Sequence, residues 1–259
     1  MRMKMMKTMT RASLIRVALA LFLAVLGTSA RAQAQAAQPA IEPGALAALN
    51  SMGAYLRTVR SFQVEAMVTD ETVLDDGQKI QREGHVDILA KMPDRLRIHV
   101  ENDRHERLYL FDGKNVTLSA ERANMYATVP APATIKALAV ALADKYDVEI
   151  PLEDLFFWNS PDWKPVGITG AMDVGPSTVA GTTCEQYAFR QADIDWQIWI
   201  QKGDHPLPRK LIITSKDDEA RPQHTAVYTW NLAPSFNDAA FVFDPPAGAS
   251  RVVLATIGK

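Results

Sequence analysis

Residues 195–214 decide the fold of this chain, and they read DWQIWIQKGDHPLPRKLIIT. Two apolar strand patterns flank a short connection with Gly203, Asp204 and two prolines, which predicts a β-hairpin with a slightly long loop. Alternation places Trp196 on one face of the first strand and Trp199 on the other. A strand with a large aromatic side chain on each face is covered on both sides, or one face lines a cavity or an interface.

The first 32 residues are predicted to be a secretory signal peptide. A basic, acid-free segment precedes a short apolar run at residues 17–26, and Ala30-Arg31-Ala32 fits a cleavage site. The apolar run is shorter than the roughly 20 residues that a membrane-spanning helix needs, so a membrane anchor is the less favoured alternative. We therefore expect a periplasmic protein with no transmembrane segment in its mature form.

The mature chain is predicted to be acidic. The signal segment holds six of the 28 basic residues and none of the 30 acidic ones, which leaves 22 against 30 and a net charge of −8. This balance argues against nucleic acid as a partner and against electrostatic docking on anionic lipid. Because Cys184 is the single cysteine, no intramolecular disulfide can form and stability must come from the core.

One domain is expected at residues 43–259, after a disordered, low-complexity leader at residues 33–42. About 227 residues are enough to bury one substantial core. We expect this domain to be a monomer.

The spacing of apolar residues predicts the order of the elements. A helix is predicted at residues 43–58 and an antiparallel meander of about six strands at residues 61–129. Helical spacing returns at residues 135–146, after Thr134 as N-cap, and again at residues 152–158. This order predicts an α+β fold in which the helices form an insertion over one face of an antiparallel sheet.

Strand patterns return from Gly167 to the end of the chain. We expect a turn at residues 174–176, further strands through the opening hairpin and residues 225–230, and a last strand at residues 241–243.

No catalytic residue is predicted. The chain has no Gly-x-Ser-x-Gly elbow, and Cys184 lies in a strand pattern where a cysteine is typically a small buried hydrophobe. Asp193 with Asp195, and Glu153 with Asp154, are close in sequence, but a chain with 30 acids offers many such pairs.

Neither a metal nor another cofactor is predicted. His99, Glu101 and His105 are the one candidate ligand set. Their spacing matches no strong zinc signature, and a solvated hairpin is the favoured interpretation.

Aromatic residues indicate a ligand pocket. We expect Trp196 and Trp230 in the core, whereas Trp158, Trp163 and Trp199 fall where a helical cover would meet a curved sheet. The predicted lining of a pocket for an acyl chain or another apolar ligand is Leu138, Leu142, Leu155, Phe156, Trp158, Trp163 and Trp199.

Motifs in the second half resemble those of a family of predicted periplasmic proteins of unknown function. They are DWQIWI at residues 195–200, PLPRK at residues 206–210, Trp230, and FVFDPPAGA at residues 241–249. This family is similar to the superfamily of the lipoprotein carriers LolA and LolB and the envelope-stress regulator RseB. The resemblance implies a strongly curved antiparallel half-barrel whose concave face is closed by helices over an apolar cavity.

We therefore predict a non-enzymatic binding or carrier protein for a lipid or a lipoprotein acyl chain. One alternative is an interaction or sensory module that binds a polypeptide segment of an envelope protein partner, and a third is a hydrolase of unknown type. The resemblance to LolA implies that an arginine in the sheet holds the helical lid, and Arg82, Arg95 and Arg97 lie in strand patterns here.

Overall fold

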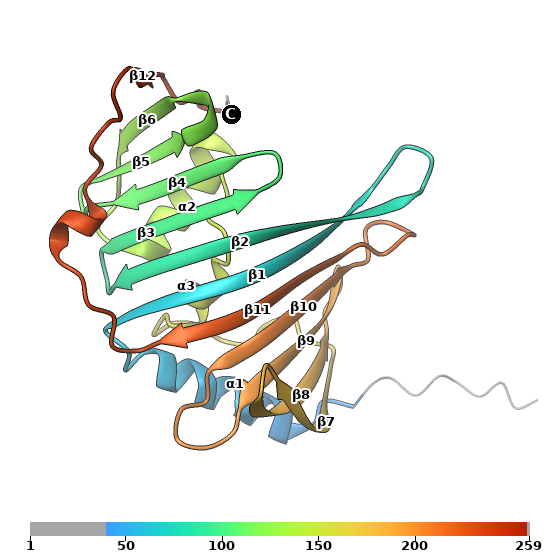
Figure 1. The fold of residues 1–259 in the computed structure, drawn as a ribbon. Coiled ribbons are helices and arrows are strands. Elements are labelled where there is room, and N and C mark those ends of the chain that lie inside the picture. Colours follow the sequence, from blue (N-terminus) through green and yellow to red (C-terminus); the bar gives the residue numbers. More distant parts are fainter. Residues whose placement is uncertain (1–39, 258–259) are drawn as a thin grey trace, which may run out of the picture. The chain divides into compact units, whose positions relative to one another are not determined.

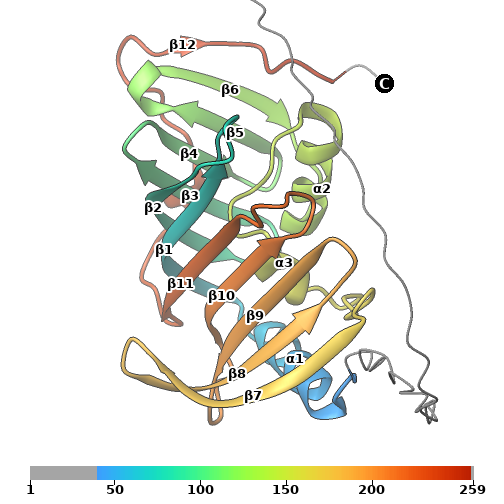
Figure 2. The ribbon, with the colours of Figure 1, turned by 90° about the vertical axis from the view of Figure 1, so that its right-hand side faces the viewer.

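The computed structural model describes residues 40–257, in which one twelve-stranded sheet carries three α-helices on one face (Figures 1 and 2). The predicted signal peptide lies outside the described residues. At the end of the predicted leader, Ile41 forms a bridge with Ala171, and the Glu42 N–H donates to the Ala171 carbonyl at 2.9 Å. Ile41 and Glu42 are thereby tied to the backbone of β7.

The helices follow the predicted order. They are α1 (Pro43–Leu56), α2 (Ile135–Tyr146) and α3 (Asp154–Trp158), with 3-10 turns η1 (Glu121–Ala123) and η2 (Asp238–Phe241). The strands are β1 (Ser61–Val73), β2 (Lys79–Lys91), β3 (Arg95–Asn102), β4 (Glu106–Phe111), β5 (Asn115–Ala120), β6 (Met125–Pro130), β7 (Gly170–Val179), β8 (Thr182–Arg190), β9 (Ile194–Gln201), β10 (Pro208–Ser215), β11 (Gln223–Asn231) and β12 (Ser250–Arg251). The Thr134 hydroxyl caps α2, as predicted, by accepting from the Ala137 N–H.

The sheet consists of two antiparallel meanders joined at β1 and β11. Its strand order is β12-β6-β5-β4-β3-β2-β1-β11-β10-β9-β8-β7. Ala66 of β1 faces Val86 of β2 on one side and Tyr228 of β11 on the other. The predicted curved antiparallel sheet with a helical cover is therefore confirmed, and the one parallel pair among the described strands is β12 with β6.

The helices cross the sheet because of this strand order. β6 and β7 lie near opposite ends of the sheet, so residues 131–169 must run across nearly its whole width (Figure 2). A connection that lies on a sheet buries its own apolar stripe and the apolar face beneath it together. Ile135, Leu138 and Leu142 of α2 and Leu155 of α3 are each at most 2% exposed.

The opening hairpin forms as predicted, and its two indoles separate onto different faces. Trp196 is opposite Ile213, and both pack in the main core on the helix-covered face. Trp199 packs on the other face in a small cluster with Val179 and Cys184. Trp196 is thus a core residue, as expected, whereas the expectation that Trp199 meets the helical cover is wrong.

Three local expectations are also corrected. β7 runs through residues 174–176 without a turn. The register shifts between Asp173 and Gly175 instead, which forms a bulge in which Gly175 has a φ of 111°. Helix α3 begins at Asp154 rather than Leu152, whose φ of 56° is left-handed. Residues 241–243 form no strand: Phe241 ends η2 and is 1% exposed, while Phe243 packs on Tyr126 with ring centroids 4.9 Å apart.

Aromatic packing joins α3 to the sheet. The Phe62 ring lies 6.3 Å from the Phe156 ring of α3 and 5.3 Å from the Trp230 ring of β11. The Asn159 side chain, at the end of α3, donates to the Leu56 carbonyl of α1 at 2.7 Å. Among residues 40–257, no helix is long and apolar enough to cross a membrane.

Replacing Phe156 with alanine is expected to lower the free energy of unfolding by about 3–5 kcal/mol, because it opens a cavity between α3 and β1. Urea unfolding followed by circular dichroism measures this change. Val166→Ala is the control, since Val166 is 73% exposed and its truncation opens no cavity. A loss below about 1 kcal/mol for Phe156→Ala would contradict the packing of α3 described above.

Candidate functional site

Two neighbouring pockets lie between the sheet and the α2 to α3 region. The first, which we name the indole pocket, has a volume of about 220 Å³. It is lined by Asp154, Trp158, Trp163, Lys164, Pro165, Val166, Ile168, Gln191, Ile194, Trp196, Leu211 and Ile213. The second, the charged pocket, has a volume of about 550 Å³ and shares Asp154 and Ile213 with the first. These two residues therefore border both pockets, and we name the place where they lie the junction.

Three indoles from two distant segments of the chain meet in the indole pocket. Trp158 ends α3, Trp163 lies in the following loop, and Trp196 comes from β9. Trp196 stacks on Phe189 at 4.3 Å between ring centroids, and its Nε1–H donates to Gln191 at 2.9 Å. The polar edge of this indole is thereby satisfied while its apolar surface faces the pocket.

Hydrogen bonds hold the loop that closes the indole pocket. Lys136 of α2 donates to both carboxylate oxygens of Asp162, at 2.6 and 2.7 Å. The hydrogen bonds from Lys136 and Ser160 lower the pKa of Asp162 to about 2, so this carboxylate is ionised at neutral pH. At the other end of the loop, the Gln191 amide donates to the Val166 carbonyl at 3.2 Å.

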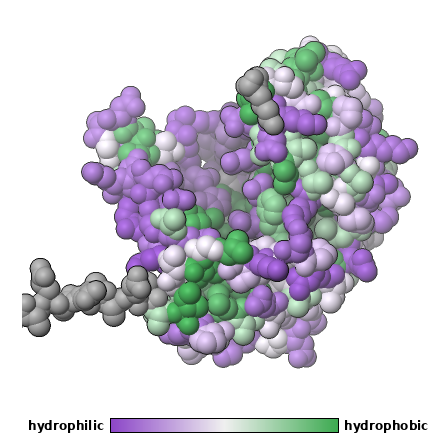
Figure 3. Space-filling model, turned by 180° about the vertical axis from the view of Figure 1, so that it is seen from behind, coloured by the Kyte–Doolittle hydropathy of each residue, from purple (hydrophilic) through white to green (hydrophobic). Residues whose placement is uncertain are grey.

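The charged pocket combines an apolar floor with a polar rim. Val68, Val86 and Val100 come from the sheet, and residues 149–154 come from the connection between α2 and α3. Figure 3 shows a hollow on this face with hydrophilic residues around its edge. The ionisable residues of the lining are Asp70, Arg82, Glu83, His105, Arg107, Glu149, Glu153, Asp154 and His224.

Only one of the three arginines considered from the sequence lines this pocket. Arg82 faces it from β2, opposite the connection at residues 149–154. Arg95 pairs with Asp94 at 2.9 Å, and Arg97 lies opposite Leu110 on the face away from the helices. Arg107, which the sequence did not single out, is the second arginine of the lining.

Asp154 is an unusual acid at the junction of the two pockets. Burial raises the pKa of its carboxyl, and the nearby His224 offsets only part of that effect. Burial also raises the pKa of Glu153, with further contributions from Asp154 and Glu149. Both shifts favour neutral carboxyls, which cost less to cover with an apolar ligand than carboxylates do.

Tyr228 lies under the cover with an unsatisfied hydroxyl. The residue is 2% exposed, and its oxygen has no hydrogen-bond partner among the described residues. Burial raises the pKa of Tyr228 well above its usual value, and the charge of Asp154 adds to this effect. The helix-covered face therefore holds an unused hydrogen-bonding group close to the junction.

The predicted lining residues fall in four places. Trp158 and Trp163 line the indole pocket, while Leu155 and Phe156 are core residues beneath α3, each 1% exposed. A third pocket, between α2 and the β5 to β6 region, is lined in part by Leu138 and Leu142. Trp199 is on the opposite face, where its Nε1–H donates to Ser177 at 3.1 Å and Lys210 lies 4.9 Å from its ring centroid.

Sequence reasoning missed the junction residues. Ile213 and His224 belong to strands that meet α3 only through the tertiary fold. An acid at the start of an otherwise apolar short helix was the one available signal for Asp154. It was read instead as one member of an ordinary carboxylate pair with Glu153.

Packing accounts for Cys184, and ion pairs account for Asp195. Cys184 is fully buried, as predicted, and burial raises the pKa of its thiol. Asp195 accepts hydrogen bonds from Arg190 at 3.1 Å and Arg221 at 2.7 Å on the outer face.

The described chain is an α+β protein with pockets between a curved sheet and its helical cover. The family described as predicted periplasmic protein (DUF2092) matches residues 45–255, and the chain belongs to this family. The family resemblance inferred from the motifs is thus confirmed. Comparison with curated proteins gives no match.

Several solved structures are similar to this chain at low sequence identity. An uncharacterized conserved protein from Thermus thermophilus is 12% identical, with 81% of this chain and 99% of that chain covered and a TM-score of 0.47. The lipoprotein LppX from Mycobacterium tuberculosis is 10% identical, with 76% of this chain and 100% of that chain covered and a TM-score of 0.45. A LolA superfamily protein from Nitrosomonas europaea is 10% identical, with 77% of this chain and 97% of that chain covered and a TM-score of 0.37. Because these TM-scores are below 0.5, we base the function proposed below on the residues of this chain.

Asp154→Asn is expected to stabilise the protein at neutral pH but not in acid. The pKa of Asp154 is higher in the folded state than in the unfolded state, where it is about 3.9. The neutral carboxyl therefore contributes its full stability below about pH 3.9, and this contribution is lost as the pH rises through the pKa of the folded state. The amide stays neutral, so the variant should gain in melting temperature over wild type as the pH rises from 4 to 8. Thermal unfolding across this pH range measures the difference.

Asp204→Asn serves as the control for this prediction, because Asp204 is exposed in the β9 to β10 loop. An advantage of Asp154→Asn that is the same at pH 4 and pH 8 would contradict burial of an ionisable group at the junction.

Proposed function

We propose that this protein is a periplasmic carrier that binds a lipid or a lipoprotein acyl chain between its sheet and its helical cover. The observation that carries this proposal is the junction of an indole-lined pocket with a larger pocket whose rim is charged. An apolar chain would occupy the indole pocket, and the polar end of the same ligand would lie in the charged pocket. Known small-molecule sites have volumes of about 300–1,000 Å³, so the charged pocket is large enough by itself and the indole pocket extends it.

The pocket chemistry favours binding over hydrolysis. The burial that raises the pKa of Asp154 and Glu153 shifts both groups toward the neutral form, which is a better neighbour of an alkyl chain than a carboxylate is. Asp70 and His224 are paired with each other at 2.6 Å on the rim of the charged pocket. Arg82 and Arg107 are positioned to face an anionic group at the polar end of the ligand.

Release would follow from movement of α3 and the loop after it. Helix α3 has five residues, and this segment is held to its surroundings by the Asn159, Lys136 and Gln191 hydrogen bonds. Each buried methylene contributes about 0.8 kcal/mol to binding, so opening the indole pocket exposes the part of the site that contributes most to affinity.

Affinity for saturated fatty acids is expected to rise about fourfold for each added methylene until the indole pocket is filled, because each contributes about 0.8 kcal/mol. Titration of the protein with fatty acids of 8 to 14 carbons, followed by tryptophan fluorescence or calorimetry, measures this slope. Ile213→Asn should weaken binding about tenfold or more, because it places an amide at the junction of the two pockets.

Ile212→Asn is the matched control for this test. Ile212 is the neighbouring half-buried residue of β10, and its side chain packs with Trp199 on the outer face. Equal affinity in wild type and Ile213→Asn, together with ligand-free mass for protein extracted from periplasm, would contradict the proposal. A stoichiometric protein partner in that extract would favour the polypeptide-binding alternative.

A further inference from the structure

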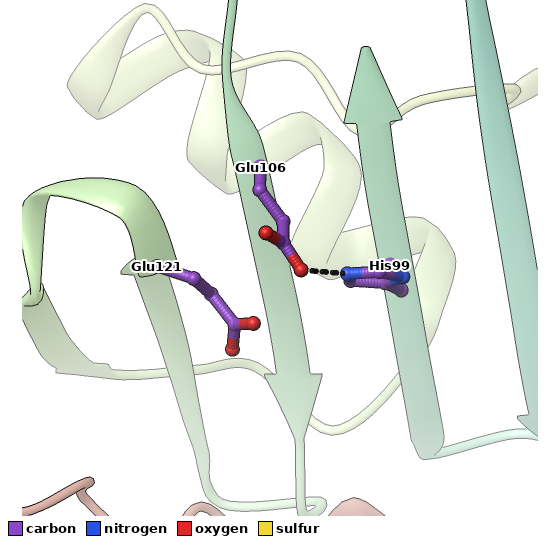
Figure 4. A group of neighbouring side chains, drawn as sticks. All are labelled: His99, Glu106 and Glu121. Atoms are coloured by element: carbon purple, nitrogen blue, oxygen red, sulfur yellow. Dashed lines mark hydrogen bonds and ion pairs between the residues drawn. The ribbon is translucent and has the colours of Figure 1, made fainter. Parts of the chain in front are cut away.

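A histidine and two glutamates converge on the outer face of the sheet, away from the ligand pockets (Figure 4). His99 comes from β3, Glu106 begins β4, and Glu121 begins η1 directly after β5. One imidazole nitrogen and one oxygen from each carboxylate all lie within 4.8 Å of one another. The His99 Nε2 and Glu106 Oε1 atoms are 2.9 Å apart. The three groups therefore face one common point in space.

Sheet register brings these residues together. Glu101 of β3 is opposite Glu106, so His99 is two residues from that pair and on the same face of β3. Ala120 of β5 is opposite Arg107 of β4, which places Glu121 next to Glu106 across the strand pair. The β3 and β4 ladders hold the Cα positions of His99 and Glu106, and Glu121 directly follows the end of β5, so side-chain rotation can adjust the geometry.

Negative charge is in excess at this point. Glu101 adds a third carboxylate on the same face, opposite Glu106. Arg122 follows Glu121 but donates to the backbone carbonyls of Asp103 and Asn102, both at 2.8 Å. Over residues 40–257, neither Glu106 nor Glu121 forms an ion pair with a lysine or an arginine. A cation placed among the carboxylates would relieve their mutual repulsion.

We propose that His99, Glu106 and Glu121 bind a Zn²⁺ ion. Zinc takes histidine nitrogen and carboxylate oxygen at about 2.0–2.2 Å, and a tetrahedral arrangement of such bonds separates its ligand atoms by about 3.4 Å. The ligand atoms here all lie within 4.8 Å of one another, which is compatible with this value, and the solvent-accessible Glu121 side chain can rotate to complete the fit. Water or the Glu101 carboxylate would fill the fourth position.

The ligand types select zinc over the hard cations. Mg²⁺ demands octahedral oxygen coordination and Ca²⁺ takes six to eight oxygen ligands, whereas imidazole suits zinc. A bound ion would connect β3, β4 and the turn after β5. This site is independent of the proposed carrier function, because the side chains lie on the face of the sheet opposite the pockets.

Calorimetric titration of untagged, chelator-treated protein with ZnCl₂ tests the site, with MgCl₂ as the comparison. We expect one Zn²⁺ per chain, no comparable binding of Mg²⁺, and a rise in melting temperature on adding zinc. Glu106→Gln and Glu121→Gln should each weaken zinc binding about tenfold or more, since each removes a charged ligand.

Glu65→Gln is the matched control, because Glu65 is an exposed glutamate of β1 on the same outer face. It should bind zinc as wild type does. Binding of equal strength in all three glutamine variants, or a stoichiometry other than one, would overturn the proposal, as would absence of zinc binding by wild type. None of these results would alter the fatty-acid titration, so the two proposals fail separately.

Discussion

The pairing of β1 with β11 is the constraint on which the rest of the structure depends. It runs from Gln63 opposite Asn231 to Asp70 opposite His224, and it joins segments more than 150 residues apart in sequence. Without it the two meanders would be separate sheets, each with a long exposed edge. With it, Tyr228 and His224 are placed beneath the helical connection, where His224 lowers the pKa of Asp154 against the effect of burial and Asp154 helps to raise the pKa of Tyr228.

The same pairing determines where the pockets form. Because the two meanders meet at β1 and β11, β6 and β7 are left near the far ends of the sheet, and the connection between them has to cross the concave face. Its helices bury apolar residues wherever they contact the strands, as Phe156 does on Phe62. The indole pocket and the charged pocket lie beside the non-helical parts of the connection, at residues 149–153 and in the loop with Trp163. Gaps between short helices, rather than a special motif, create the candidate site.

Local periodicity was sufficient to predict most of the elements. The hairpin at residues 195–214, the six strands of the first meander and helix α2 all form as expected, since each is encoded by contacts near in sequence. Alternation separated Trp196 from Trp199 but could not tell which of them faces the helices, because that depends on the path of residues 131–169.

The Phe241 and Phe243 pattern is typical of a strand, but these rings instead cover the outer face of the sheet. Register also explains why the His99 cluster was missed: Glu106 and Glu121 join it across strands, whereas His105 points into the charged pocket.

Alternation along a strand also explains how one sheet can offer two unrelated candidate sites. Ile213 lines both pockets, while the adjacent Ile212 packs in the outer cluster with Trp199. Neighbouring residues of a strand point to opposite faces of the sheet and share only the backbone. Substitutions on one face therefore need not disturb the other. Each face also has its own electrostatic character: buried acids that favour the neutral form line the covered face, whereas solvated carboxylates gather on the outer face. An apolar ligand suits the first environment and a cation the second, because desolvation decides affinity in one and charge in the other.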